Sequence, residues 1–570
     1  MSETFDYVII GGGTAGLVVA ARLAENENVR VCVLEAGEDV THTDEASIPG
    51  IVSKLWLQDT NWGFASAPQK HSEDKVLHLV RGKGLGGSSM VRHLARQLNA
   101  AESVRFSIQY SSAAGVKSQH HSALQPANMM SQSLSYTAEG IKELGLQPDE
   151  KHFGSGPIIN TLSRYKSSYS TNWLKALEEC GIPYNSNAMG GESIGAWVAS
   201  LAIHPETSKR ISSATAYYEP NKHRKNLTVI TGAHVTQIQL NHVSTGKPIA
   251  EGVEYQKEGK KYIVSAKKEV VLAAGSFQTP QILELSGIGK KSDHPAILSV
   301  YELKPPHESC NVLQFDQERA VAEYQKFVDK KEGMLTSVPG LYAFLPLSKL
   351  NDPESLREYA SQRRWNKIQD SIAKVQQEWL SDDHVPQIEF IILPYFWPTV
   401  PKSARDEGKS YISTTAILLH PFSRGSVHIK SSDPFAHPNI DLSALDNDID
   451  VQALLKGLKL IREIVTETKA FEDVIEKEVA PGPMGDSDEN LERYLKTGLT
   501  SAFHPIGTAA MMKREDGGVV DERLRVYGVD GLRIVDASIL PFQVGAHIQA
   551  TVYAVAEKAA DLIKEDAAHH

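Results

Sequence analysis

The N-terminal stretch up to Glu35 carries the pattern that most restricts the fold. Tyr7-Val8-Ile9-Ile10 is typical of a buried strand, and G-x-G-x-x-G follows it at Gly11, Gly13 and Gly16. These glycines permit a tight turn and let a pyrophosphate approach the amides at a helix N-terminus. A second apolar run ends at Glu35, whose carboxylate can accept hydrogen bonds from a ribose. A βα turn that binds nothing is the weaker interpretation here, so the sequence predicts a dinucleotide site.

A second glycine-rich stretch, Arg81 to Ser89, follows an apolar run and formally repeats G-x-G-x-x-G. No acidic strand end follows at the proper distance, so a second nucleotide fold is not indicated. Four glycines and two serines suggest a loop that lies against a flat ligand and donates backbone and hydroxyl hydrogen bonds. On the pattern alone, a flexible surface loop fits about equally well.

The other expected elements are spread along the whole chain. Dinucleotide-type strands near both ends, with no linker that marks a clean division, predict a discontinuous domain into which a second domain is inserted. The chain has strand-like runs near 227–230 and 269–273, a β-meander between 235 and 265, a second sheet at 388–394 and 413–420, and helices at 449–467 and 549–565.

The size and charge of the chain exclude several classes of protein. Its 570 residues imply at least two cores, and its formal net charge of -11 offers no basic surface for nucleic acid or anionic lipid. No apolar run is long enough to span a membrane. Cys32, Cys180 and Cys310 lie far apart, which predicts no disulfide framework and, with no signal peptide visible, a cytoplasmic location. No histidine or cysteine spacing suggests a metal site.

The segment Gly275 to Gly289 closely resembles a signature of the glucose-methanol-choline (GMC) oxidoreductases, which use FAD and act on alcohols. The chain is similar to that family also in the N-terminal glycine pattern and in the loop Gly82 to Ser89. The resemblance covers most of the chain and is strongest to the aryl-alcohol oxidase-like fungal members. Three C-terminal segments also resemble the family: His504-Pro505-Ile506-Gly507-Thr508, Val535-Asp536-Ala537-Ser538 and His547-Ile548-Gln549-Ala550-Thr551.

The resemblance implies an α/β fold in which a discontinuous Rossmann-like FAD-binding domain is joined to an α+β substrate-binding domain built on an antiparallel sheet. The expected boundaries are 1–140, 205–292 and 500–566 for the FAD-binding domain. Residues 141–204 and 293–499 would then form the substrate-binding domain.

Two histidines are the candidate catalytic residues. Histidine suits proton transfer near neutrality, and His504 and His547 each lie beside a turn, so they could converge on one site. Without the family context, two structural histidines would be the better interpretation. The resemblance implies that His504 takes the hydroxyl proton while the carbinol hydride passes to the flavin, and that His547 hydrogen-bonds the same oxygen.

The resemblance also implies which residues hold FAD. Asp536 and Ala537 are expected near its pyrophosphate and ribityl chain. Gln549, Ala550 and Thr551 are expected to present helix N-terminal amides to the pyrimidine side of the ring. The remaining expected contacts are Gly11, Gly13, Thr14, Ala15, Gly16, Glu35, Ala36, Arg81, Gly82, Gly86, Gly87, Ser88, Val235, Ala274 and Gly275.

Two stretches depart from the family pattern. Met90-Val91-Arg92 stands where the family has a flavin-contacting asparagine, and the serine- and glutamine-rich run 106–138 has no counterpart there. After Gly289 the usual Pro-Gly-Val-Gly-x-Asn element is missing. Either the enzyme has a remodelled flavin lid, or the sequence carries splicing or frame errors; we favour errors as the hypothesis, which sequencing of the transcript tests.

The expected function is FAD-dependent oxidation of a primary or aryl alcohol to the aldehyde, with oxygen or another acceptor taking the electrons. The expected partners are thus small molecules, without nucleic acid or membrane. Two alternatives remain open at this point: a flavin-binding lyase or cyclase of the same fold without net redox chemistry, and an inactive member.

Overall fold

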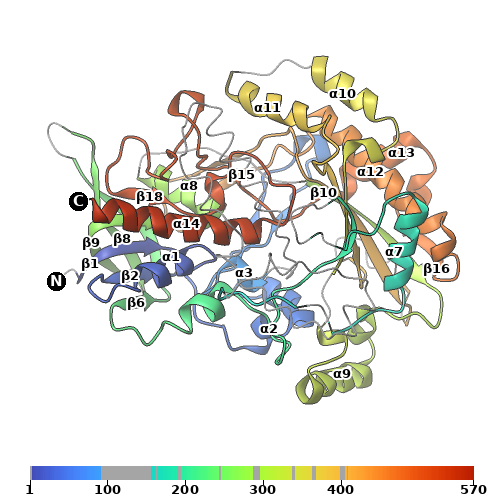
Figure 1. Cartoon of the computed structure of the whole chain (residues 1–570), viewed down its shortest axis with the longest axis horizontal. Helices are drawn as coiled ribbons and strands as arrows, with labels where there is room; N and C mark the ends of the chain where they lie inside the picture. The colour runs from blue at the N-terminus through green and yellow to red at the C-terminus, as the bar shows by residue number, and fades with distance from the viewer. Residues whose placement is uncertain are drawn as a thin grey trace.

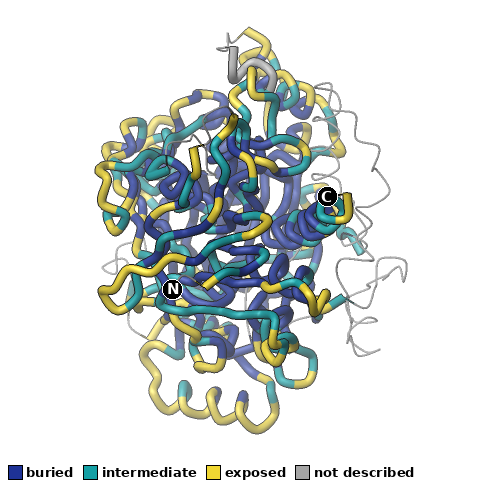
Figure 2. The backbone as a smooth tube through the Cα atoms, turned by 90° about the vertical axis from the view of Figure 1, so that its left-hand side faces the viewer, coloured by how far each residue is buried: buried dark blue, intermediate teal, exposed yellow. Residues whose placement is uncertain are grey.

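The computed structural model describes residues 3–91, 156–161, 164–186, 188, 194–242, 246–286, 295–336, 340–362, 367–397, 405–406 and 408–569. Two sheets organise this part of the chain, and helices cover them (Figure 1). Buried residues run through the centre of the molecule beneath an exposed periphery (Figure 2). The helices are α1 (Gly16–Leu23), α2 (Asp44–Ser47), α3 (Ser88–Val91), α7 (Ser170–Glu179), α8 (Gly275–Leu285), α9 (Gln317–Lys330), α10 (Pro353–Gln362), α11 (Lys367–Trp379), α12 (Asp448–Thr466), α13 (Asp488–Gly498) and α14 (Ile548–Ala568).

The first sheet combines a parallel part with a meander. Its described strands are β1 (Glu3–Ile10), β2 (Val31–Leu34), β6 (Leu227–Ile230), β7 (His234–Asn241), β8 (Ile249–Lys257), β9 (Lys260–Leu272) and β18 (Leu532–Ile534). The strands β6, β2, β1, β9 and β18 pair in parallel, whereas β8 pairs antiparallel with the first half of β9 and β7 pairs antiparallel with β8. The predicted strands and meander are therefore confirmed. Val8, Ile9 and Ile10 are fully buried, as expected of a central strand covered on both faces.

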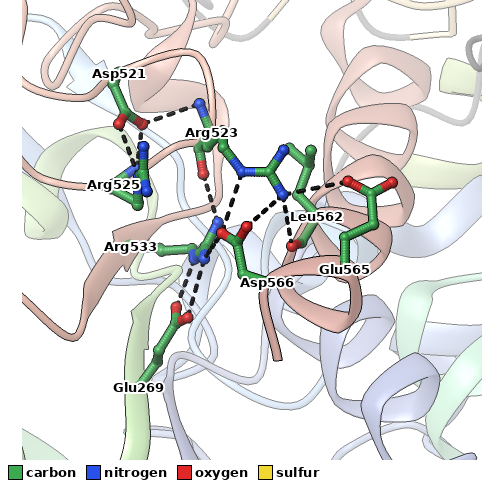
Figure 3. Close-up of polar contacts among 8 residues, drawn as sticks. All are labelled: Glu269, Asp521, Arg523, Arg525, Arg533, Leu562, Glu565 and Asp566. Carbon is green, nitrogen blue, oxygen red and sulfur yellow. Dashed lines mark hydrogen bonds and ion pairs between the residues drawn. The ribbon is translucent and has the colours of Figure 1, made fainter. Parts of the chain in front are cut away.

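The C-terminal helix packs against the first helix after the glycine turn, α14 against α1 (Figure 1). Charges fix its far end to the sheet. Arg533 of β18 is 2% exposed and pairs with Glu269 of β9 at 2.5 Å and with Asp566 of α14 at 2.5 Å (Figure 3). Arg523 pairs with Asp566 at 2.6 Å and with Glu565 at 3.2 Å. This network connects the end of α14 to the strands below it.

The second sheet is antiparallel. It contains β5 (Gly195–Val198), β10 (Pro295–Leu303), β11 (Leu341–Leu345), β12 (Ile388–Leu393), β13 (Tyr411–Leu418), β16 (Ile475–Ala480) and β17 (Thr500–Ser501). Helix α12 packs on β13, β10 and β12. The strands predicted at 388–394 and 413–420 and the helix predicted at 449–467 correspond to β12, β13 and α12. Two short hairpins complete the described strands, β3 (Phe64–Ala65) with β4 (His78–Leu79) and β14 (Ser426–His428) with β15 (Asn439–Asp441).

One apolar core extends from the parallel sheet to one face of the antiparallel sheet. It includes Val8 and Leu272 from the first sheet and Tyr342 and Ile417 from the second. The two sheets are therefore packed through a shared interior. In the described ranges, no helix has both the length and the apolar composition needed to cross a membrane.

Candidate active site

A cleft of about 1180 Å³, including its open mouth, lies at the carboxyl ends of β1, β2 and β9. This is the edge at which parallel α/β sheets bind nucleotides. Most residues predicted to contact the cofactor line it: Gly11, Gly13, Thr14, Ala15, Glu35, Ala36, Arg81, Gly82, Gly87, Ser88, Val235, Ala274, Gly275, Asp536, Ala537 and Gln549. Segments from the N-terminal, middle and C-terminal parts of the chain therefore meet at one cavity.

Four predicted contact residues do not line the cleft. At Gly16, a Cβ atom would lie 2.0 Å from the carbonyl oxygen of Gly11, so glycine is needed for α1 to pack on the turn. The amide of Gly86 donates to the carbonyl of Gly12 at 2.8 Å. Ala550 and Thr551 are buried in the first turn of α14. These four residues lie behind the lining and support it.

The two glycine loops lie against each other. Gly87 has φ +51°, and a Cβ atom there would lie 2.7 Å from Cα of Gly13. The hydroxyl of Ser213 donates to the carbonyl of Gly13 at 3.1 Å and adds a third segment to this contact. The loop that the sequence left undecided is therefore part of the cleft wall.

Glu35 joins three turns of the cleft wall. Its Oε2 accepts the amide of Gly12 at 2.8 Å, and its Oε1 accepts the amides of Gly37 at 2.9 Å and Gly84 at 3.1 Å. Burial raises the pKa of this carboxyl to about 7, against the three amide donors, which lower it. The predicted ribose acceptor thus lines the cleft while most of its hydrogen-bonding capacity is used by the protein.

Asp536 is a second buried carboxylate that lines the cleft. Its Oδ2 accepts the amide of Gly275 at 2.9 Å and the hydroxyl of Thr279 at 2.6 Å, and its Oδ1 accepts the amide of Ser538 at 2.7 Å. Burial raises the pKa of this carboxyl above its usual value. The aspartate thereby connects the start of α8 to the C-terminal stretch.

A second cavity of about 780 Å³ adjoins the cleft. Its wall is mainly apolar and contains four large aromatic side chains together with both candidate histidines. The lining residues are Trp56, Val80, Val91, Ala296, Leu298, Tyr342, Ile391, Leu393, Trp397, Thr415, Ile417, Thr500, Ser501, Ala502, Phe503, His504 and His547. Such a wall suits an organic molecule with little charge.

His504 and His547 face each other at the junction of the two cavities. Their ring centroids are 5.3 Å apart with an interplanar angle of 55°. Pro505 and Ile548, which follow them directly in the chain, line the cleft. Residues separated by a long stretch of sequence are therefore brought together as the motif predicted.

Glu389 is a site residue that the sequence did not reveal. It lies on β12, is fully buried, and its Oε1 is 2.6 Å from Nε2 of His547. Its Oε2 is buried with no hydrogen-bond partner among the described residues. The ring of Tyr342 meets His547 edge-on, with centroids 5.2 Å apart. The available signal was the lone acid in the apolar run Ile388–Leu393.

Two neighbouring aromatic residues after β12 have different surroundings. Trp397 lines the second cavity, whereas Phe396 packs against Tyr411 at a centroid distance of 5.3 Å. Met90 is buried, and Val91 lines the second cavity. Arg92, the stretch 106–138 and Gly289 lie outside the described residues. Among the residues described, no group of three His, Cys, Asp or Glu side chains could hold a metal ion.

Comparisons with known proteins cover nearly the whole chain. The N-terminal and C-terminal models of the GMC oxidoreductase family match residues 5–300 and 421–556. A dehydrogenase of Monascus purpureus, mpl7, is 32% identical over 99% of this chain and 96% of its own length. An FAD-dependent oxidoreductase of Chaetomium thermophilum has a similar structure, with TM-score 0.88, 26% identity and coverage of 99% of this chain and 100% of that one. A fungal aryl-alcohol oxidase superposes with TM-score 0.85 and 26% identity, with 100% of both chains covered.

Proposed function

This chain belongs to the GMC oxidoreductase family of FAD-dependent enzymes, and on that premise we propose that it oxidises a primary or aryl alcohol to the aldehyde. The observation that carries the proposal is the pair of imidazoles, with ring centroids 5.3 Å apart, at the junction of a glycine-walled cleft and an aromatic-lined cavity. Such a junction lets one group accept a proton while a neighbouring acceptor takes the hydride.

The residues of the cleft fit FAD. At Gly275, the space that a Cβ atom would occupy has no other heavy atom within 4 Å, so the backbone there is open to a ligand. Gln549, at the start of α14, lines the cleft, and its Nε2 is buried without a hydrogen-bond partner among the described residues. We propose that the two glycine loops and Glu35 hold the dinucleotide part and that the start of α14 holds the ring. When bound, the flavin supplies the acceptor for the hydride that leaves the carbinol carbon.

The proposed mechanism assigns one role to each histidine. His504 takes the hydroxyl proton, which makes the carbinol C–H bond a better hydride donor. His547 hydrogen-bonds the same oxygen, and Glu389 fixes the orientation of its ring through Nε2. Both imidazoles act on one oxygen, so the alcohol carbon is aligned with the neighbouring cleft.

The lining of the second cavity favours a neutral aromatic alcohol as the substrate. Trp56, Tyr342, Trp397 and Phe503 offer four aromatic faces, and the described wall carries no lysine, arginine, aspartate or glutamate. A neutral aromatic alcohol would bury its ring there, with the hydroxyl at the histidines. The electron acceptor, oxygen or another oxidant, stays part of the proposal. The domain boundaries given above and the cytoplasmic location stay predictions.

The test uses the purified FAD-containing enzyme without oxygen. Benzyl alcohol is expected to abolish the visible absorption of the bound cofactor and to yield one equivalent of benzaldehyde, whereas glucose should have far less effect. Admission of oxygen, or addition of a dye acceptor, then identifies the oxidant by peroxide formation or by dye reduction. Retention of the absorption with every alcohol of a broad panel would overturn the proposal and favour a lyase or cyclase.

A further inference from the structure

The carbonyl oxygen of His504 accepts a hydrogen bond from a side chain that belongs to the segment of the other histidine. Nε2 of Gln543 donates to it at 2.5 Å, and Gln543 lies four residues before His547. Gln543 is 4% exposed, and its Oε1 has no partner among the described residues. Its amide is therefore held mainly through this one donated bond, which connects the two histidine-bearing segments directly.

The peptide before His504 is held as well. Phe503 has φ +59°, a left-handed conformation that costs free energy for a residue with a large side chain. Its amide donates to Oγ of Ser501 at 2.9 Å, and its carbonyl accepts Nη2 of Arg81 at 2.6 Å. Two consecutive carbonyls, at 503 and 504, are thus bound by side chains from distant parts of the chain. Such over-determined backbone is common where a side chain must be aimed.

Gln543 is in turn fixed by a buried histidine. Nδ1 of His420 lies 3.0 Å from the carbonyl oxygen of Gln543, so this nitrogen carries the proton that is donated. His420 is 4% exposed, and its ring packs against Trp379 at a centroid distance of 4.5 Å with an interplanar angle of 53°. Burial lowers the pKa of His420 to about 3, so the ring stays neutral and donates in a single tautomer. Gln543 is therefore bound on both its backbone and its side chain.

We propose that Gln543 is a positioning residue for His504, and that it couples the backbone at His504 to the segment leading to His547 so that the two rings keep their mutual geometry. The inference rests on the proposed role of His504 as the base. Gln543 lines neither cavity, so its effect on the reaction passes through His504.

The first test replaces the donor without changing the volume much. Gln543→Met removes the hydrogen bond to the His504 carbonyl. We expect kcat and kcat/KM for benzyl alcohol to fall together by about tenfold. A misaligned His504 weakens stabilisation of the transition state without changing how tightly the alcohol binds. FAD content and its visible spectrum should stay those of the wild type.

The second test introduces a hydrogen-bond donor at position 543 that is present only at low pH. In Gln543→Glu, a protonated carboxylic acid donates to the carbonyl, whereas the carboxylate cannot. We expect kcat near the wild-type value at low pH and a decline of at least about tenfold as the carboxyl ionises, opposite to the rise that a histidine base produces. Burial at this position would raise the pKa of that carboxyl and bring the decline into the working range.

A matched control separates positioning from general stability. Gln69 is 1% exposed and lines neither cavity; its Nε2 donates to the carbonyl of Ala67 at 2.8 Å, and its Oε1 accepts the amide of Ala444 at 3.0 Å. Gln69→Met should therefore lower the unfolding midpoint at least as much as Gln543→Met and leave kcat within about twofold of the wild type. An unchanged kcat in Gln543→Met together with an unchanged pH profile in Gln543→Glu would overturn the inference.

A measurement that needs no turnover separates this inference from the proposed function. With ¹³C-labelled histidine in the oxidised enzyme, the ring signal of His504 is assigned by its loss in His504→Ala. We expect this signal to shift or double in Gln543→Met and to remain single in Gln69→Met. An unchanged signal in Gln543→Met would overturn the positioning role, whereas failure of every alcohol to reduce the wild-type enzyme would overturn the proposed function instead.

Discussion

Nε2 of His547 and Oε1 of Glu389 are 2.6 Å apart, although one residue directly precedes α14 and the other is the second residue of β12. A hydrogen bond to a charged group contributes about 1.5–3 kcal/mol, which corresponds to about 10–150-fold in rate when it is lost in the transition state. Glu389→Met, which removes the acceptor with little change of volume, should therefore slow alcohol oxidation by at least about tenfold while FAD stays bound. Anaerobic stopped-flow measurement of cofactor reduction checks this. An unchanged rate would show that the orientation of His547 does not depend on the carboxylate.

His504→Ala should slow cofactor reduction by about a hundredfold or more, because the proposed base is removed. FAD should remain bound, since His504 lines the second cavity and not the cleft. The control is His71→Ala, whose side chain is 39% exposed and lines neither cavity. Near-normal reduction in His504→Ala would remove that residue from its proposed role.

Glu35 predicts a pH dependence of stability. Its pKa is raised from 4.5 to about 7 in the fold, so between these values the unfolded chain releases the proton first. Stability from this group is therefore complete below pH 4.5 and declines as pH rises through 7, by about 3 kcal/mol in total. Glu35→Gln should lack this slope. Denaturant unfolding of both holoenzymes across this range tests it, and a wild-type advantage that does not shrink with rising pH would contradict the argument.

The network at the end of α14 predicts a difference between two arginines. Arg533→Met leaves Glu269 and Asp566 without their buried partner and should cost about 3 kcal/mol of unfolding free energy. The matched variant is Arg525→Met, whose side chain is 52% exposed in its pair with Asp521, and it should cost less than about 1 kcal/mol. Equal losses in circular-dichroism unfolding would show that the buried network adds no more stability than an exposed ion pair.

The regular elements could be predicted from local patterns. The strand before Gly11, the helix after it and the meander that ends in β9 follow hydrophobic periodicity, as do β12, β13 and α12. The position of β18 beside β9 could not be predicted this way, because Leu532–Ile534 is too short to carry a pattern and its partner lies far away in the sequence. Its placement depends on tertiary packing.

Those residues of the candidate site that belong to recognisable sequence motifs could be predicted. The glycine patterns and the two histidines were found from sequence, and the structure brings most of them to one junction. Glu389 and Gln543 were missed because a single acid in an apolar strand and a single amide in a turn have no spacing to recognise. Their roles depend on His547 and His504, so they emerge only when distances are known.

The pairing of β18 with β9 and the packing of α14 on α1 bear on how the polypeptide is made. During translation β1, β2 and β9 are synthesised long before β18 and α14. Until β18 is made, the edge of β9 that pairs with it has no partner strand. A nascent chain stalled before Leu532 would expose that edge to chaperones and to aggregation. Cofactor binding is thus expected to be a late event that follows synthesis of β18 and α14.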